Sequence, residues 1–181
     1  ENLIIKHLPL VKRLVSKMDA GYNYETEDLI NIGVIGLMDA ISKYDLWWHD
    51  FNFICDQVRR AGYTPMMWTD MFWNNKEEFI KRAPRDVVMC NWYYDKFDDL
   101  SKAEISAYTW LQDNGFSQMP TGSAWLYDDQ FIDTVKHCSN IITSEKLFGY
   151  LQTVWKPTCH SAMSFHLKAI NALASARNEI T

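Results

Sequence analysis

Residues 87–93 read Val-Val-Met-Cys-Asn-Trp-Tyr, and this stretch decides the fold class. Its length and its β-branched and aromatic residues are typical of a buried β-strand. A charged stretch with helical spacing precedes it at 75–82, and a helical stretch at 101–114 follows it and ends at Gly115. Glycine is the preferred residue just past a helix end. The centre of the chain therefore predicts a helix, a strand and a second helix in succession.

The same alternation extends outward in both directions. The further predicted elements are helix 47–61 ending at Gly62, strand 63–68, strand 116–119, helix 128–139, strand 147–154 and helix 161–179. Strand followed by helix, four times over, predicts a parallel sheet with right-handed crossovers. Four such units are half of a (β/α)8 barrel, so we expect an α/β fold of the TIM half-barrel type. An isolated half exposes two sheet edges, through which the chain is expected to self-associate if nothing else covers them.

The first 45 residues follow a different pattern, and they contain none of the eight tryptophans, which lie between Trp47 and Trp155. Residues 1–18 have helical spacing, a break is expected at 21–23, and acidic residues then suit the N-terminus of a second helix. The apolar stripe of the first helix is Ile4, Leu8, Val11, Val15 and Met18, and that of the second is Leu29, Gly33, Gly36, Leu37, Ala40 and Tyr44. We predict a helical hairpin at 1–45, with the two glycines allowing close packing, and a second domain at 46–181.

Bulk properties exclude some function classes. The net charge is −5 and no basic run is longer than Lys12-Arg13, so we do not expect autonomous DNA binding. No apolar run approaches 18 residues, so neither a membrane span nor a membrane partner is expected. No motif points to a cofactor.

The four cysteines, Cys55, Cys90, Cys138 and Cys159, are scattered and form no CxxC pair. They are typical of reduced thiols in a cytoplasmic protein. The alternative is a zinc site built from His137, Cys138, Cys159 and His160. Its spacing fits no standard zinc pattern, so no metal site is predicted.

Part of the first piece carries a family pattern. Residues 7–11 read His-Leu-Pro-Leu-Val, residues 27–40 read Glu-Asp-Leu-Ile-Asn-Ile-Gly-Val-Ile-Gly-Leu-Met-Asp-Ala, and Lys-Tyr-Asp follows at 43–45. This pattern resembles the start of region 2 of bacterial sigma factors of the sigma-70 family. The resemblance implies a helical segment that helps to bind core RNA polymerase, with Asp28, Leu29 and Asp39 as candidate contacts. The promoter-reading pattern of that family does not follow Asp45, so promoter recognition is not implied.

Four stretches at or just after predicted strand ends form a second pattern. They are Met-Trp-Thr-Asp-Met-Phe at 67–72, Asn-Trp-Tyr-Tyr-Asp at 91–95, Gly-Ser-Ala-Trp at 122–125 and Leu-Gln-Thr-Val-Trp at 151–155. Residues 46–181 thereby resemble the C-terminal half of a family 20 glycoside hydrolase barrel, of the β-N-acetylhexosaminidase type. The resemblance implies an amino-sugar subsite. Its walls would be Trp68, Trp92, Trp125 and Trp155, and its hydrogen-bonding groups Asp70 and Tyr94.

Two departures from the hydrolase pattern limit the activity. The catalytic Asp-Glu pair of that family lies upstream of the matched stretches, and the nearest pair here, Glu27-Asp28, is reversed and lies in the sigma-like helix. Lys156-Pro157-Thr158 follows Trp155, where relatives often have Gly-Asp or a nearby Glu. Because general acid assistance is typically worth about 10²–10⁴-fold in rate, we expect no hydrolysis and name no catalytic residue.

Three interpretations follow. The leading one is a truncated hydrolase-derived half-barrel behind a truncated sigma-like segment, which at most binds an N-acetylhexosamine sugar. The alternative is a transcription-related protein whose first 45 residues contact core RNA polymerase. The third is a soluble α/β protein whose motifs are remnants.

Overall fold

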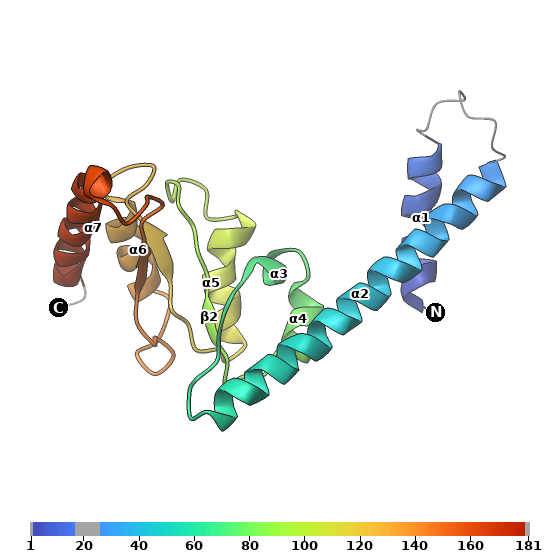
Figure 1. The fold of residues 1–181 in the computed structure, drawn as a ribbon, viewed down its shortest axis with the longest axis horizontal. Helices are drawn as coiled ribbons and strands as arrows, with labels where there is room; N and C mark the ends of the chain where they lie inside the picture. Colours follow the sequence, from blue (N-terminus) through green and yellow to red (C-terminus); the bar gives the residue numbers. More distant parts are fainter. Residues whose placement is uncertain (1, 17–25, 180–181) are drawn as a thin grey trace. The chain divides into compact units, whose positions relative to one another are not determined.

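The computed structural model describes residues 2–16 and 26–179 and divides the chain into two compact units, Glu1–Gln57 and Val58–Thr181 (Figure 1). The expected break at 21–23 and the residues Met18 and Glu25 lie outside the described residues. The side chains of Ile4, Glu27 and Asp28 also lie outside them.

The first unit contains the two predicted helices, α1 (Asn2–Val15) and α2 (Thr26–Arg60). Val11 and Val15 are buried, as the α1 stripe predicts. Val11 lies directly against Gly33, where any Cβ atom would collide with its side chain. Gly36 is exposed and has no atom within 4 Å of a Cβ position, so the predicted close packing is confirmed at Gly33 and wrong at Gly36. An α-helix turns by about 300° over the three residues from Gly33 to Gly36, so Gly36 does not lie on the side of α2 that contacts α1.

Helix α2 is one continuous helix of 35 residues, so residues 47–60 are helical as predicted, but they continue the helix that begins at Thr26. No glycine or proline lies between Leu37 and Ala61, so no helix-breaking residue interrupts the backbone hydrogen bonds of the helix there. The helix ends at Gly62, as predicted. Gly62 has a φ of 83°, and Tyr63 N–H donates to Val58 C=O at 3.1 Å, which is a Schellman cap. The predicted domain boundary at 45/46 thus lies inside α2, and it stays a prediction.

The second unit alternates strands and helices, which is compatible with the predicted α/β class, and the half-barrel arrangement stays a prediction (Figure 1, green to red). Its elements are β1 (Met66–Trp68), α3 (Asp70–Trp73), α4 (Lys76–Arg82), β2 (Val88–Cys90), α5 (Ala103–Asp113), β3 (Thr121–Ser123), α6 (Gln130–Ser139), β4 (Leu151–Thr153), η1 (His160–Ala162), α7 (Met163–Ala176) and η2 (Arg177–Glu179). The short helix α3 was not predicted. Gly115, at φ 77°, ends the helical segment after α5, as the sequence predicts.

The strands form two parallel pairs, β1 with β2 and β3 with β4. Single parallel bridges from Met89 to Gln118 and from Trp92 to Thr121 join the two pairs. A further bridge from Gln118 to Leu147 connects the segments that precede β3 and β4. Each strand has only three residues, and the third begins at Thr121 rather than within the predicted run 116–119. Pro120 supplies the reason, because it has no N–H to continue a ladder between Gln118 and Thr121.

The core of the second unit is aromatic and lies between strands and helices. Its fully buried side chains include Phe72, Phe79, Tyr108, Leu111 and Phe116. Helix α6 approaches β3 so closely that a Cβ atom at Gly122 would lie 2.7 Å from Thr134 Oγ1. This close packing fixes the carboxyl end of β3, from which part of the candidate site is built.

Candidate functional site

A buried asparagine organises the carboxyl ends of β1 and β2. Asn91 is fully buried, and its Oδ1 accepts hydrogen bonds from Thr69 Oγ1 at 2.6 Å and from Trp73 Nε1 at 2.9 Å. Its Nδ2 donates to the carbonyl of Glu104 at 2.8 Å. Asn91 thus makes three side-chain hydrogen bonds, and these hold the segments after both strands in a defined position.

A row of aromatic rings crosses these strand ends. Trp73 contacts Trp92 edge-on with ring centroids 4.8 Å apart, and Trp92 stacks on Tyr94 at 4.9 Å with 28° between the planes. Tyr94 in turn meets the edge of Trp155, which follows β4, at 6.0 Å. We call Trp73, Trp92, Tyr94 and Trp155 the aromatic row. It joins segments that lie more than 80 residues apart in the chain.

Two hydrogen bonds hold the rings of the aromatic row in place. Trp92 Nε1 donates to Asp70 Oδ2 at 3.2 Å, and Thr153 Oγ1 donates to the hydroxyl of Tyr94 at 3.1 Å. Tyr94 is buried, and this burial raises the pKa of its hydroxyl. The tyrosine therefore stays neutral at physiological pH and acts as a fixed support within the row.

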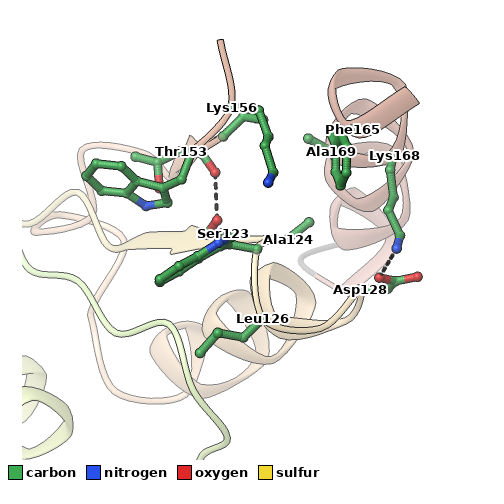
Figure 2. A pocket seen from close by; sticks show the side chains of 12 residues that line it. Ser123, Ala124, Leu126, Asp128, Thr153, Lys156, Phe165, Lys168 and Ala169 are labelled. Atoms are coloured by element: carbon green, nitrogen blue, oxygen red, sulfur yellow. Dashed lines mark hydrogen bonds and ion pairs between the residues drawn. The ribbon is translucent and has the colours of Figure 1, made fainter. Parts of the chain in front are cut away.

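A small cavity of about 110 Å³ lies where the segments after β3 and β4 meet α7. Trp125 and Trp155, from the segments after β3 and β4, line it. Phe165 and Lys168 line it from α7 (Figure 2). Ser123 Oγ donates to the carbonyl of Thr153 at 2.8 Å, and this hydrogen bond joins the ends of β3 and β4 beside the cavity. Lys168 forms an ion pair with Asp128.

The structure brings most of the predicted sugar-site residues together. Asp70, Trp92, Tyr94 and Trp155 form one connected group, and Trp155 shares the cavity with Trp125. Trp68 is 47% exposed and makes no ring contact with the row among the residues that the structure describes. That these residues bind a sugar stays a prediction.

Three contributors were missed by the sequence analysis: Trp73, Thr153 and Phe165. Trp73 lies three residues after Asp70, and one helical turn places such residues on neighbouring faces, so its spacing was an available signal. Thr153 and Phe165 had no comparable signal, because only the packing of β4 and α7 brings them to the site.

A metal site has no structural basis in the described part of the chain. No group of three or more His, Cys, Asp or Glu side chains there is arranged to hold a metal ion. Cys138 is buried in the core, where burial raises its pKa well above the ordinary value, whereas Cys159 is exposed. Among the described residues, no helix is both long and apolar enough to cross a membrane.

The first unit presents a second candidate surface. Six large apolar side chains of α2 are more than half exposed, and four of them precede Trp47: Ile32, Ile35, Met38 and Leu46. Asp39 lies among them and pairs with Lys43 at 2.7 Å. Leu29, which the sequence names as a candidate contact, is half-buried. This apolar surface of α2 has the composition of a protein-binding helix, because single exposed apolar residues are ordinary but a group on one helix is not.

An aromatic cluster follows this surface along α2. Trp47 stacks on Phe51 with centroids 5.2 Å apart and 3° between the planes, and Trp48 meets both rings edge-on. Trp48 is only 3% exposed. These ring contacts all lie within the part of α2 that follows the sigma-like pattern.

Comparison with known proteins decides the character of this first segment. Residues 3–51 match the family model of sigma-70 region 2. The match begins in α1 and ends in α2 just at the aromatic cluster, six residues beyond the 45 that the sequence analysis assigned. No curated protein and no solved structure matches the chain. The N-terminal segment is therefore sigma-factor-like and transcription-related, whereas the hydrolase resemblance gains no support from the comparisons.

Proposed function

We propose that the protein is a transcription-related protein that contacts core RNA polymerase through its sigma-70 region 2-like segment. The observation that carries this proposal is the family match over residues 3–51. With such a partner, the proposed location of the protein is the cytoplasm of a bacterium. The net charge of −5 favours contact with a protein over contact with DNA.

The apolar surface of α2 is the proposed contact. Ile32, Ile35 and Met38 follow one another at three-residue spacing, and Asp39 lies beside them. Core residues of protein interfaces are typically apolar side chains with few charges among them. Asp28 and Leu29 precede this surface on the same helix and are proposed as further contacts, together with Asp39.

The test is capture of purified bacterial core polymerase by the tagged full-length chain. Ile35→Asp places a charge in the proposed contact, and Ile170→Asp on α7 is the matched control, since the two isoleucines are 66% and 61% exposed. Capture by the parent and the control, with loss for Ile35→Asp, is expected. Equal capture by both variants would place the contact elsewhere, and no capture by the folded parent would refute the proposal.

The aromatic row supports a second candidate function, binding of an amino sugar by the second unit. Aromatic faces pack against the apolar face of a sugar ring, and Asp70 offers a carboxylate beside Trp92. In this proposal, the unit is half of a hydrolase-type barrel that no longer catalyses. The observation favouring it is the convergence of Asp70, Trp92 and Trp155 from three strand ends.

Calorimetric titration with N-acetylglucosamine and N-acetylgalactosamine at millimolar concentration tests this second candidate. Binding that is lost in Trp92→Ala and kept in Trp110→Ala is expected, because Trp110 is 39% exposed on α5 and lies outside the row. Absence of heat with both sugars, in a chain that is folded by circular dichroism, would contradict it. The proposal does not include hydrolysis.

A further inference from the structure

The cavity beside α7 has a charge that the amino-sugar proposal does not explain. Three of its lining residues are charged: Asp128, Lys156 and Lys168. Asp128 and Lys168 neutralise one another as an ion pair. Lys156 has no carboxylate partner among the described residues, and its ammonium lies 4.8 Å from the centre of the Phe165 ring. The cavity therefore carries one positive charge that is not balanced.

The walls of the cavity are aromatic and exposed. Trp125, Trp155 and Phe165 are 54%, 59% and 46% exposed. Large aromatic side chains are usually mostly buried, so three exposed ones around one cavity are unusual. They come from three different elements and surround one small volume. Figure 2 shows Lys156, from the segment after β4, reaching into the space between Thr153 and α7. Three aromatic side chains and one ammonium group thus face the same space.

This arrangement selects the chemistry of a ligand. The aromatic side chains suit the C–H face of a ring, and the ammonium suits an anion on that ring. A phosphate monoester carries about −1.5 to −2 charges at pH 7, whereas a carboxylate carries one, which is what a single lysine balances. The cavity is smaller than the roughly 300–1,000 Å³ of drug-sized pockets, so it suits one sugar residue that stays partly exposed.

We infer that the cavity between the ends of β3 and β4 and helix α7 binds a sugar ring that carries a carboxylate, that is, a hexuronate. This inference rests on the proposed carbohydrate binding of the second unit and names the substrate class of the part of the site that contains Trp155. Lys156 is the specificity-determining residue, and Trp125, Trp155 and Phe165 supply the ring contacts. Lys156 departs from the hydrolase pattern, and in this inference it binds the carboxylate of the sugar.

The experiment is a calorimetric titration of the full-length chain with glucuronate, N-acetylglucosamine and glucose 6-phosphate at low ionic strength. Glucuronate is expected to bind most tightly. Lys156→Gln is expected to weaken glucuronate roughly fivefold, as an exposed ion pair allows, and to leave N-acetylglucosamine unchanged. Lys81→Gln, an exposed lysine on α4, is the matched control and should change neither affinity.

The outcomes separate the two proposals. Binding of N-acetylglucosamine at least as tight as that of glucuronate, with no effect of Lys156→Gln, would overturn the hexuronate inference and leave amino-sugar binding standing. Tighter binding of glucose 6-phosphate would overturn the choice of a carboxylate. Binding of no sugar by a chain that is folded by circular dichroism would overturn both. Addition of 0.5 M salt should weaken glucuronate and leave N-acetylglucosamine unchanged, because the neutral sugar makes no ionic contact with Lys156.

Discussion

The hydroxyl of Thr69 donates a hydrogen bond to Oδ1 of Asn91 at 2.6 Å, and neither residue has any exposed surface. This bond joins the residue after β1 to the residue after β2. The same oxygen also accepts a hydrogen bond from Trp73 of the aromatic row. The position of the row therefore depends on a buried polar network as well as on ring contacts.

Replacement of Asn91 by alanine is expected to lower the free energy of unfolding by about 2–4 kcal/mol, because it leaves the Thr69 hydroxyl, the Trp73 indole and the Glu104 carbonyl without their partner. Urea unfolding followed by circular dichroism measures this loss. Asn74→Ala, at an exposed helix end, is the control and should change stability by less than about 0.5 kcal/mol. Similar losses in both variants would show that the network contributes little.

The two glycines of α2 are expected to respond oppositely to alanine. Gly36→Ala should stabilise the protein by about 0.5–1 kcal/mol, because alanine favours the helix and the position is open. Gly33→Ala should gain nothing or lose stability, because its methyl group would collide with Val11. Thermal unfolding at 222 nm compares them. Equal stabilisation by both changes would mean that α1 does not pack on α2 at Gly33.

Asp86 is expected to make stability depend on pH. Arg59 donates to both of its carboxylate oxygens, at 2.5 and 2.7 Å, and these hydrogen bonds hold the pKa of Asp86 below its ordinary value of 3.8. A lowered pKa in the folded state stabilises the protein above pH 4, and this contribution is lost as the pH falls through the lowered pKa. Because the pair is largely exposed, Asp86→Asn should cost at most about 1 kcal/mol at pH 6.

Urea unfolding at pH 6 and near pH 2.5 checks the sign of this effect. The difference between the parent and Asp86→Asn should shrink at the lower pH. Asp113→Asn, an exposed carboxylate at the end of α5, serves as the control and should show no difference at either pH. A difference for Asp86→Asn that grows on acidification would contradict the assignment.

Cys159 is expected to be the first thiol to react in the native protein. It is exposed, and its hydrogen bond with Ser161 lowers the pKa of its thiol, so more of it is present as thiolate. Cys55, Cys90 and Cys138 are buried, and burial raises the pKa of Cys90 to about 11. Alkylation by iodoacetamide with peptide mapping should find Cys159 modified first. Fast modification that persists in Cys159→Ser would disprove this order.

The sequence predicted elements better than it predicted their limits. Apolar periodicity located α1 and the start of α2, and Gly62 and Gly115 marked helix ends correctly because both adopt a positive φ. A change of composition near residue 46 suggested a structural break, but an α-helix ignores composition unless glycine, proline or a cap interrupts it. The third strand begins later than predicted, because Pro120 follows the predicted run 116–119 and has no N–H to continue a ladder.

The alternation of strands and helices was predictable from the sequence, because it follows from local residue spacing. The sigma-like character of the N-terminal segment was predictable because a contiguous motif carries it. The set of side chains that form the candidate site depends on the packing of the folded chain. Trp92, Thr153 and Phe165 lie on separate elements, and only strand pairing and helix packing bring such distant residues within reach of one another. Their mutual distances depend on long-range packing, which no local pattern in the chain encodes.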